Sequence, residues 1–198
     1  MAELWTAIDE EAEPALAQIA GDVVLDLTIG VPMWHPLTQG HRLDNYLLVM
    51  ASQLGQRRIP AVFGRKVHGN VSSLRVGPAR YRANDVPPVM QVRARGHPEA
   101  PDWMEQVSDA CAAAIDSDEL GTEAVRLDLT FAVSSLRNWT NLWKPTIDAL
   151  GPLLGTHSAE APWASRDDRI VEMGLHRITD NSLGHDIDIR VWWSAATT

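Results

Sequence analysis

Hydrophobic and polar positions alternate in two matching stretches of the chain. LDLTIGV, residues 25–31, and LDLTFAV, residues 127–133, share five of seven residues and place apolar side chains at alternate positions. A period of two is typical of β-strands with one buried face. Because the two stretches are nearly identical, they also indicate an internal repeat.

A helical pattern precedes and follows each of these strands. After them come Asn-led helical segments at 45–54 and 141–150, and then β-rich runs at 71–76 and 170–178. Before them, apolar residues recur every three or four positions and form one stripe on a helix. The first stripe holds Trp5, Ile8, Ala12, Ala15 and Ile19, and the second holds Trp103, Val107, Cys111 and Ala114. The order helix, strand, helix, strand is therefore expected twice.

Two further segments, residues 89–96 and 185–193, alternate with period two and are expected to be strands. The Pro-rich NDVPPV, residues 84–89, separates the halves, and the pattern leaves open whether segment 89–96 closes the first half or opens the second. We expect two divergent copies, residues 1–85 and 86–198, packed as a pseudo-dimer within one chain. Helices and hairpin-like strands without a β-α-β rhythm favour the α+β class.

The composition is that of a folded, soluble protein. Of 198 residues, 45% are hydrophobic and eight are tryptophan, and no apolar run approaches the roughly 18 residues that cross a bilayer. The N-terminal segment is acidic, unlike the positive start of a signal peptide, so we expect a cytoplasmic protein with no membrane partner. Cys111 is the single cysteine, which excludes an intrachain disulfide and indicates a packing role.

The net charge of −9 is unevenly distributed. Residues 37–96 carry ten basic and two acidic residues, a charge of +8, and the remainder carries −17. Arginine side chains match phosphate oxygens in bidentate geometry, so this block is a candidate DNA-binding surface. The alternative is that its arginines pair with the acidic remainder across an internal interface.

The second half carries a motif that resembles a known family. TNLWKPTIDALG, residues 140–151, followed by the acidic pair of RDDRIVEMGLHRI, residues 166–178, is similar to the signature of RusA-like Holliday-junction resolvases. That signature is Asp-x-Asp-Asn-Leu-x-Lys-x-x-x-Asp-Ala-Leu and, after a variable loop, an acidic pair leading into a strand. The resemblance covers residues 89–193 well and the first half in outline. It implies an α+β mixed sheet with helices and a dimer, here within one chain.

The resemblance also implies a chemistry. In the family, aspartates hold Mg²⁺, a lysine assists at the phosphate, and a DNA phosphodiester near a branch is hydrolysed. Mg²⁺ prefers hard carboxylate oxygens and offsets charge on the phosphoryl group, and a lysine ammonium acts on the same oxygens. Carried over to matching positions, Lys144 would be catalytic, and Asp167 and Asp168 would be catalytic and hold the metal.

The chain departs from the signature at its leading aspartates. In the second half Asn138 and Thr140 stand at these positions, where the alternative role of each is to cap a helix. In the first half Arg42 replaces the first aspartate and Asp44 fits the second. Basic residues, Arg65 and Lys66, stand where the first-half acidic pair is expected. A complete catalytic set would therefore combine both halves: Asp44, Lys144, Asp167 and Asp168.

We predict a RusA-like protein of DNA recombination or repair that binds branched or distorted DNA, with Mg²⁺-dependent endonuclease activity weak or lost. Mg²⁺ is needed only if cleavage survives. The alternative is a non-catalytic module that binds a protein partner on a retired nuclease scaffold. The structural alternative for the acidic pair is that the flanking Arg166 and Arg169 neutralise Asp167 and Asp168 on the surface. The predicted DNA contacts are Arg42, Arg57, Arg58, Arg65, Lys66 and Asn141.

Overall fold

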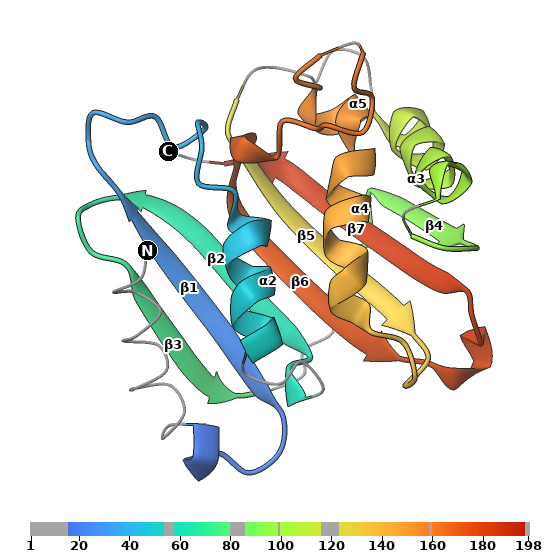
Figure 1. Ribbon diagram of the computed structural model, residues 1–198, viewed down its shortest axis with the longest axis horizontal. Coiled ribbons are helices and arrows are strands. Elements are labelled where there is room, and N and C mark those ends of the chain that lie inside the picture. Colours follow the sequence, from blue (N-terminus) through green and yellow to red (C-terminus); the bar gives the residue numbers. More distant parts are fainter. Residues whose placement is uncertain are drawn as a thin grey trace.

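A computed structural model describes residues 16–53, 58–79, 86–98, 100–115, 123–158 and 160–196. These residues form a mixed sheet of seven strands in the order β3-β1-β2-β6-β5-β7-β4, with helices on one face (Figure 1). The strands are β1 Val23–Val31, β2 Ala61–His68, β3 Ser73–Pro78, β4 Met90–Ala94, β5 Val125–Val133, β6 Ile170–Thr179 and β7 Ile187–Ala195. The helices are α2 Leu43–Gln53, α3 Pro101–Ala114, α4 Trp143–Ala149 and α5 Gly151–Leu154, with short turns η2 Trp139–Leu142, η3 Asp167–Arg169 and η4 Asn181–Leu183. The α+β class is confirmed.

The alternation in the repeated stretches places one face of β1 and β5 in the core. In β1, Leu25 and Leu27 are fully buried, while Asp26 and Thr28 point to the face without helices and are half-buried. The core lies between this inner face of the sheet and the helices. Trp103 of α3 and Trp143 of α4 are among its largest side chains.

The two halves repeat one arrangement of strands. β1 runs parallel to β2 and antiparallel to β3, and β5 runs parallel to β6 and antiparallel to β7. The repeated aspartates, Asp26 and Asp128, have Phe63 and Gly174 as their register partners on β2 and β6. Phe63 and Gly174 also face each other where β2 and β6 pair antiparallel. Equivalent positions therefore meet at the sheet centre, as they would across a two-fold axis.

Each half contains a β-α-β unit, which the sequence pattern did not predict. α2 joins the parallel strands β1 and β2, and η2, α4 and α5 lie between the parallel strands β5 and β6. The sequence pattern missed β2 because its inward positions carry Gly64 and Lys66 rather than large apolar residues.

The run at 71–76 forms β3, which is equivalent to β7 and not to β6. β4 pairs with β7, so segment 89–96 lies beside the second half.

The predicted helical stripe of the second half is confirmed in α3. Trp103, Val107 and Cys111 are fully buried, and burial raises the pKa of the Cys111 thiol to about 12. The first stripe lies outside the described residues except for Ile19. None of the described helices has the length and apolar character needed to cross a membrane.

Candidate functional site

An ion cluster forms where α2, α4 and η3 meet, and both halves of the chain contribute to it. Lys144 of α4 places its ammonium 2.6 Å from Asp148 Oδ1, 2.8 Å from Asp167 Oδ2 and 3.8 Å from Asp44 Oδ2. Asp44 belongs to the first half, and the other three belong to the second. The structure therefore brings together the residues that the sequence could only combine as a hypothesis.

Local sequence explains how α4 presents its part of the cluster. Lys144 and Asp148 are four residues apart, which places both on one face of the helix. Asn138 caps η2 just before α4, because its side-chain oxygen accepts hydrogen bonds from Thr140 N at 3.1 Å and Thr140 Oγ1 at 2.8 Å. The capping role of Asn138 is confirmed, and neither residue supplies the charge of the signature aspartates.

Asp167 is the most heavily paired carboxylate of the cluster. Its side chain is fully buried, and its Oδ1 lies 2.9 Å from Arg42 Nε while Oδ2 accepts from Lys144. Neutralisation by Arg166 and Arg169 would place Asp167 on the surface, but Asp167 is buried. Arg169 is itself buried and donates to the carbonyls of Glu123 and Leu154.

His157 joins the cluster from the loop after α5, a role that the sequence did not indicate. Its Nε2 lies 3.2 Å from Arg42 Nη2. One possible ligand atom from each of His157, Asp167 and Asp168 lies within 4.8 Å of the others. No motif spacing connects His157 to the acidic pair, so only the folded loop reveals the contact.

Lys66 enters the cluster from β2 of the first half. Its Nζ donates to the carbonyl of Asp168 at 2.7 Å and lies 3.4 Å from the carbonyl of Gly40. The residue is only 4% exposed, and burial lowers its pKa to about 8, although Asp168, Asp167 and Asp44 favour its charged form. Its ammonium therefore serves the interior of the cluster rather than the outer surface.

Asp44 is the least well satisfied member. It is 2% exposed, and neither carboxylate oxygen makes a hydrogen bond of full geometry among the described residues, although the nearby backbone N–H of Asn45 favours its charged form. Burial raises its pKa to about 6, and the charge of Asp167 adds to this effect while Lys144 opposes it. Burial also raises the pKa of Asp148. For Lys144, burial lowers the pKa, but hydrogen bonds to Asp148 and Asp167 outweigh it and raise the pKa.

The donor set does not fit Mg²⁺ in this arrangement. Mg²⁺ requires oxygen ligands in near-octahedral geometry and usually keeps several waters. Both oxygens of Asp167 already face cations, and the nearby His157 is a nitrogen donor. The four carboxylates of the cluster face three protein cations, so its formal charge is only −1 when all are ionised. The carboxylates are Asp44, Asp148, Asp167 and Asp168, and the cations are Arg42, Lys66 and Lys144.

The remaining predicted DNA contacts do not gather on one surface. Asn141 is exposed beside α4 and accepts from Asn138 Nδ2 at 3.1 Å. Arg58 donates to the carbonyls of Ile19 and Gly21. Arg65 points to the face of the sheet without helices. Arg57 lies outside the described residues. Internal ion pairs involve several arginines of the basic block: Arg42, Arg65, Arg93 and Arg95.

The register also corrects the place of the first-half acidic pair. Asp167 precedes Gly174 by seven residues and Asp168 precedes it by six. The β2 residue equivalent to Gly174 is Phe63. The same distances before Phe63 lead to Gln56 and Arg57, which are therefore the first-half counterparts of the acidic pair and lie outside the described residues. Arg65 and Lys66 are therefore strand residues of β2 and do not replace the pair.

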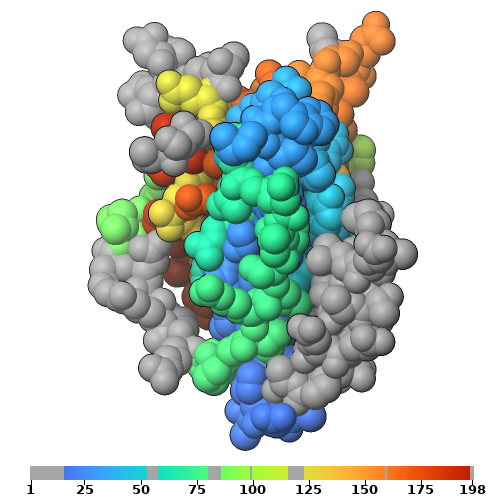
Figure 2. Space-filling model, turned by 90° about the vertical axis from the view of Figure 1, so that its left-hand side faces the viewer, coloured from blue at the N-terminus to red at the C-terminus, as the bar shows by residue number. Residues whose placement is uncertain are grey.

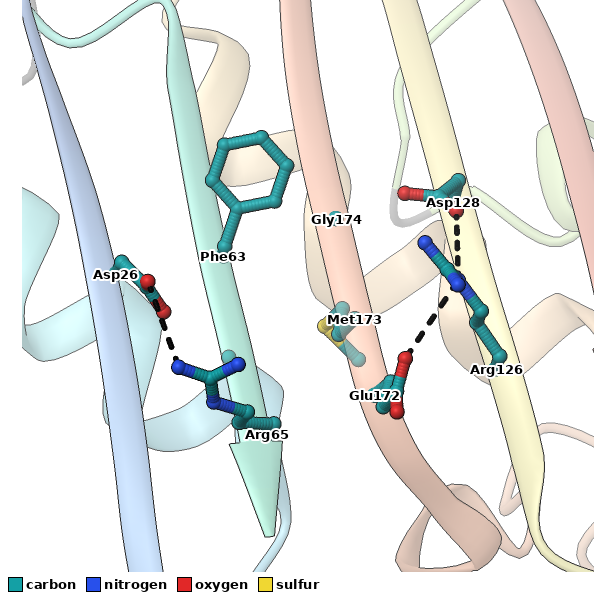
Figure 3. Close-up of a pocket in the computed structure, with 9 residues that line it drawn as sticks. Asp26, Phe63, Arg65, Arg126, Asp128, Glu172, Met173 and Gly174 are labelled. Atoms are coloured by element: carbon teal, nitrogen blue, oxygen red, sulfur yellow. Dashed lines mark ion pairs between the residues drawn. The ribbon is translucent and has the colours of Figure 1, made fainter. Parts of the chain in front are cut away.

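A second polar feature, a hollow of about 220 Å³, lies on the face of the sheet without helices (Figure 3). Its centre is the Phe63–Gly174 pair. Asp26 lies 3.8 Å from Arg65 on one side, and Asp128 lies 3.9 Å from His176 on the other. The repeated aspartates thus each meet a cationic or protonatable side chain from the neighbouring strand. An added Cβ at Gly174 would meet the carboxylate of Asp128, so that carboxylate would have to move.

No family model matches the chain, and no curated protein matches it.

Proposed function

We propose that the chain is a RusA-like protein in which two divergent copies form a pseudo-dimer that binds branched or distorted DNA. In this proposal Mg²⁺-dependent cleavage is weak or lost. The motif around Lys144 supports the family, and the repeated strand arrangement is consistent with a dimer fused into one chain. One observation carries the functional conclusion: Lys144 lies among three aspartates where a nuclease of this kind would need a metal ion.

The cluster explains why cleavage would be weak. A metal ion bound by Asp167 would have to displace Lys144 or Arg42, each within 3 Å of its oxygens. Any residual metal-dependent cleavage at Asp167 and Asp168 would first require these cations to leave.

The rim of the cluster offers positive charge to a phosphate. The side chains of Arg42 and Lys144 are 38% and 35% exposed, so their outer parts can meet a ligand while their inner parts hold Asp167. Arginine recognises phosphate oxygens with its fork of donors. We therefore assign the DNA-facing side of the protein to the rim beside α2 and α4.

Binding and cleavage are tested on a labelled four-way junction and a duplex of equal length at several salt concentrations. We expect tighter binding to the junction, with a log-log salt slope near −0.9 for each phosphate contact. Arg42→Gln should lower the magnitude of that slope by about 1. Arg126→Gln is the matched control, because Arg126 is 59% exposed on the opposite face of the sheet. Equal, salt-independent binding of both DNAs would refute the proposal, and efficient nicking with Mg²⁺ or Mn²⁺ would refute its statement on cleavage.

One observation favours a second candidate, a non-catalytic module that binds a protein partner. Arg93 and Arg95 both pair with Asp186, and Arg65 pairs with Asp26, so these arginines are partly neutralised within the chain. This pairing leaves less free positive charge for DNA. Stoichiometric recovery of a protein from native lysate, with no DNA binding by the purified chain, would support this candidate over the first.

A further inference from the structure

The segment between β1 and α2 carries a tryptophan in solvent. Trp34 is 82% exposed and its neighbour Met33 is 77% exposed, whereas the other described tryptophans are buried or half-buried. The segment lies in the upper middle of the molecule in Figure 2, where its atoms are blue.

Trp34 begins a series of rings that leads back into the fold. Its ring stacks on His35 with centroids 5.7 Å apart and planes 19° apart, and His35 lies 5.6 Å from His41. His41 stacks on Tyr46 of α2 at 6.4 Å, and its Nδ1 lies 3.2 Å from the Tyr46 hydroxyl. The exposed ring is therefore supported by a continuous set of side chains.

The backbone of this segment is held in an uncommon conformation. Gly40 and His41 have φ values of 61° and 48°, and His41 is the one described residue other than glycine with positive φ. For His41, unlike glycine, this conformation has an energetic cost and persists where surrounding contacts enforce it. The contacts here are the ring series and the approach of Lys66 to the Gly40 carbonyl at 3.4 Å.

The same segment continues into the ion cluster. Arg42 follows His41 directly and reaches Asp167 and His157, and Lys66 joins Gly40 to Asp168. Residues 28–43 include no Asp or Glu, so the segment presents no carboxylate to a phosphate. A flat exposed ring followed by a partly exposed arginine matches a ligand that combines a planar group with negative charge.

We propose that Trp34 stacks on an unpaired nucleobase of the bound DNA while Arg42 meets a neighbouring phosphate. This inference rests on the proposed DNA-binding function and assigns the single-stranded part of the substrate to this segment. Stacking on an aromatic side chain tolerates any base, because every base offers a flat face. Arg42 would add the salt-dependent part of the contact.

The test compares a four-way junction with unpaired bases at its crossing, the same junction fully paired, and a 12-nucleotide thymine strand. Trp34→Ala should weaken binding of the two probes with unpaired bases by about 5- to 150-fold, with little change for the fully paired junction. Trp34→Phe should restore most of the affinity. Replacing the unpaired bases by abasic positions should remove the difference between Trp34→Ala and the unmutated protein.

Leu136→Ala is the matched control, because Leu136 is 96% exposed on the corresponding segment of the second half and belongs to no ring series. Equal losses for Leu136→Ala and Trp34→Ala would indicate general apolar adhesion and overturn the inference. Unchanged affinity of Trp34→Ala would overturn it and leave the proposed function intact. Failure of the unmutated protein to bind any probe would overturn both. Loss of a protein partner without loss of DNA affinity would assign the surface to that partner.

Discussion

Replacing Asp44 by asparagine should make the protein more stable at neutral pH. Asp44 is 2% exposed, and its carboxylate oxygens make no hydrogen bond of full geometry among the described residues, so the nearby Asn45 N–H and Lys144 ammonium offset its burial only in part. Its charge also lies near that of Asp167, so ionisation of Asp44 is unfavourable in the folded state. Asparagine has nearly the same shape and removes this charge.

The magnitude follows from the pKa of Asp44, which rises from 3.8 to about 6 on folding. This difference corresponds to about 3 kcal/mol. Because the folded state holds the proton more tightly, the favourable contribution is full below pH 4 and disappears as the pH rises through 6. At pH 7.5 Asp44→Asn should therefore raise the free energy of unfolding by as much as about 3 kcal/mol.

Denaturant unfolding between pH 4 and pH 8 measures this effect. The unmutated protein should lose stability relative to Asp44→Asn as the pH rises from 4 to 6, and the gap should then stay constant. Asp26→Asn is the control, since Asp26 is 36% exposed on the other face of the sheet and should change stability by less than about 0.5 kcal/mol. Destabilisation by Asp44→Asn at pH 7.5, or a gap independent of pH, would refute the argument.

Three further predictions concern buried or tightly packed positions. Lys144→Met should destabilise the fold at pH 8 by about 2 kcal/mol, which is below the usual cost of breaking a buried ion pair because the Lys144 side chain is 35% exposed. The loss should be smaller at pH 5, where Asp44 is protonated, and denaturant unfolding at both pH values measures the difference. Gly30→Ala should cost about 2 kcal/mol, since its Cβ would lie 2.5 Å from the Val71 carbonyl, whereas Gly77→Ala meets no neighbouring atom within 4 Å and should be nearly neutral in thermal melts. Cys111 should resist a thiol reagent at pH 8 until denaturant is added, because it is fully buried and its pKa is about 12; rapid labelling of the native protein would contradict this.

Periodicity predicted the strands whose inward residues are large and apolar. Leu25 and Leu127 mark β1 and β5, and the prediction succeeded because each strand packs a row of such residues under the helices. β2 gave no such signal. Its Gly64 packs against Leu47 of α2, and the ammonium of its buried Lys66 donates to the Asp168 carbonyl. A buried position satisfied by tertiary hydrogen bonds has no local pattern.

The residues of the candidate site also fall into two groups, those that a sequence motif locates and those that only the fold brings together. The motif located Lys144, Asp167 and Asp168, because all three lie within one half of the chain at the spacing of the signature. The approach of Asp44 depends on the pairing of β2 with β6, which brings α2 beside α4. His157 depends on the course of the loop after α5. Contacts between distant segments follow from the topology of the sheet, which a single repeat pattern does not determine.

The two halves share strand order but carry different charges at corresponding positions. Asp44 corresponds to Thr140 and Lys144 to Leu48 in the alignment of the halves, and Leu48 packs against the core. The described residues therefore form this type of ion cluster once. Under the proposed function a symmetric dimer would offer two such clusters to a branched DNA, whereas the described residues offer one, beside a segment with an exposed tryptophan. Buried ion pairs are often no more stable than apolar residues of similar size. Because the cluster includes an aspartate whose ionisation opposes folding, stability does not account for the cluster, whereas the proposed recognition of a ligand on one side of the protein would.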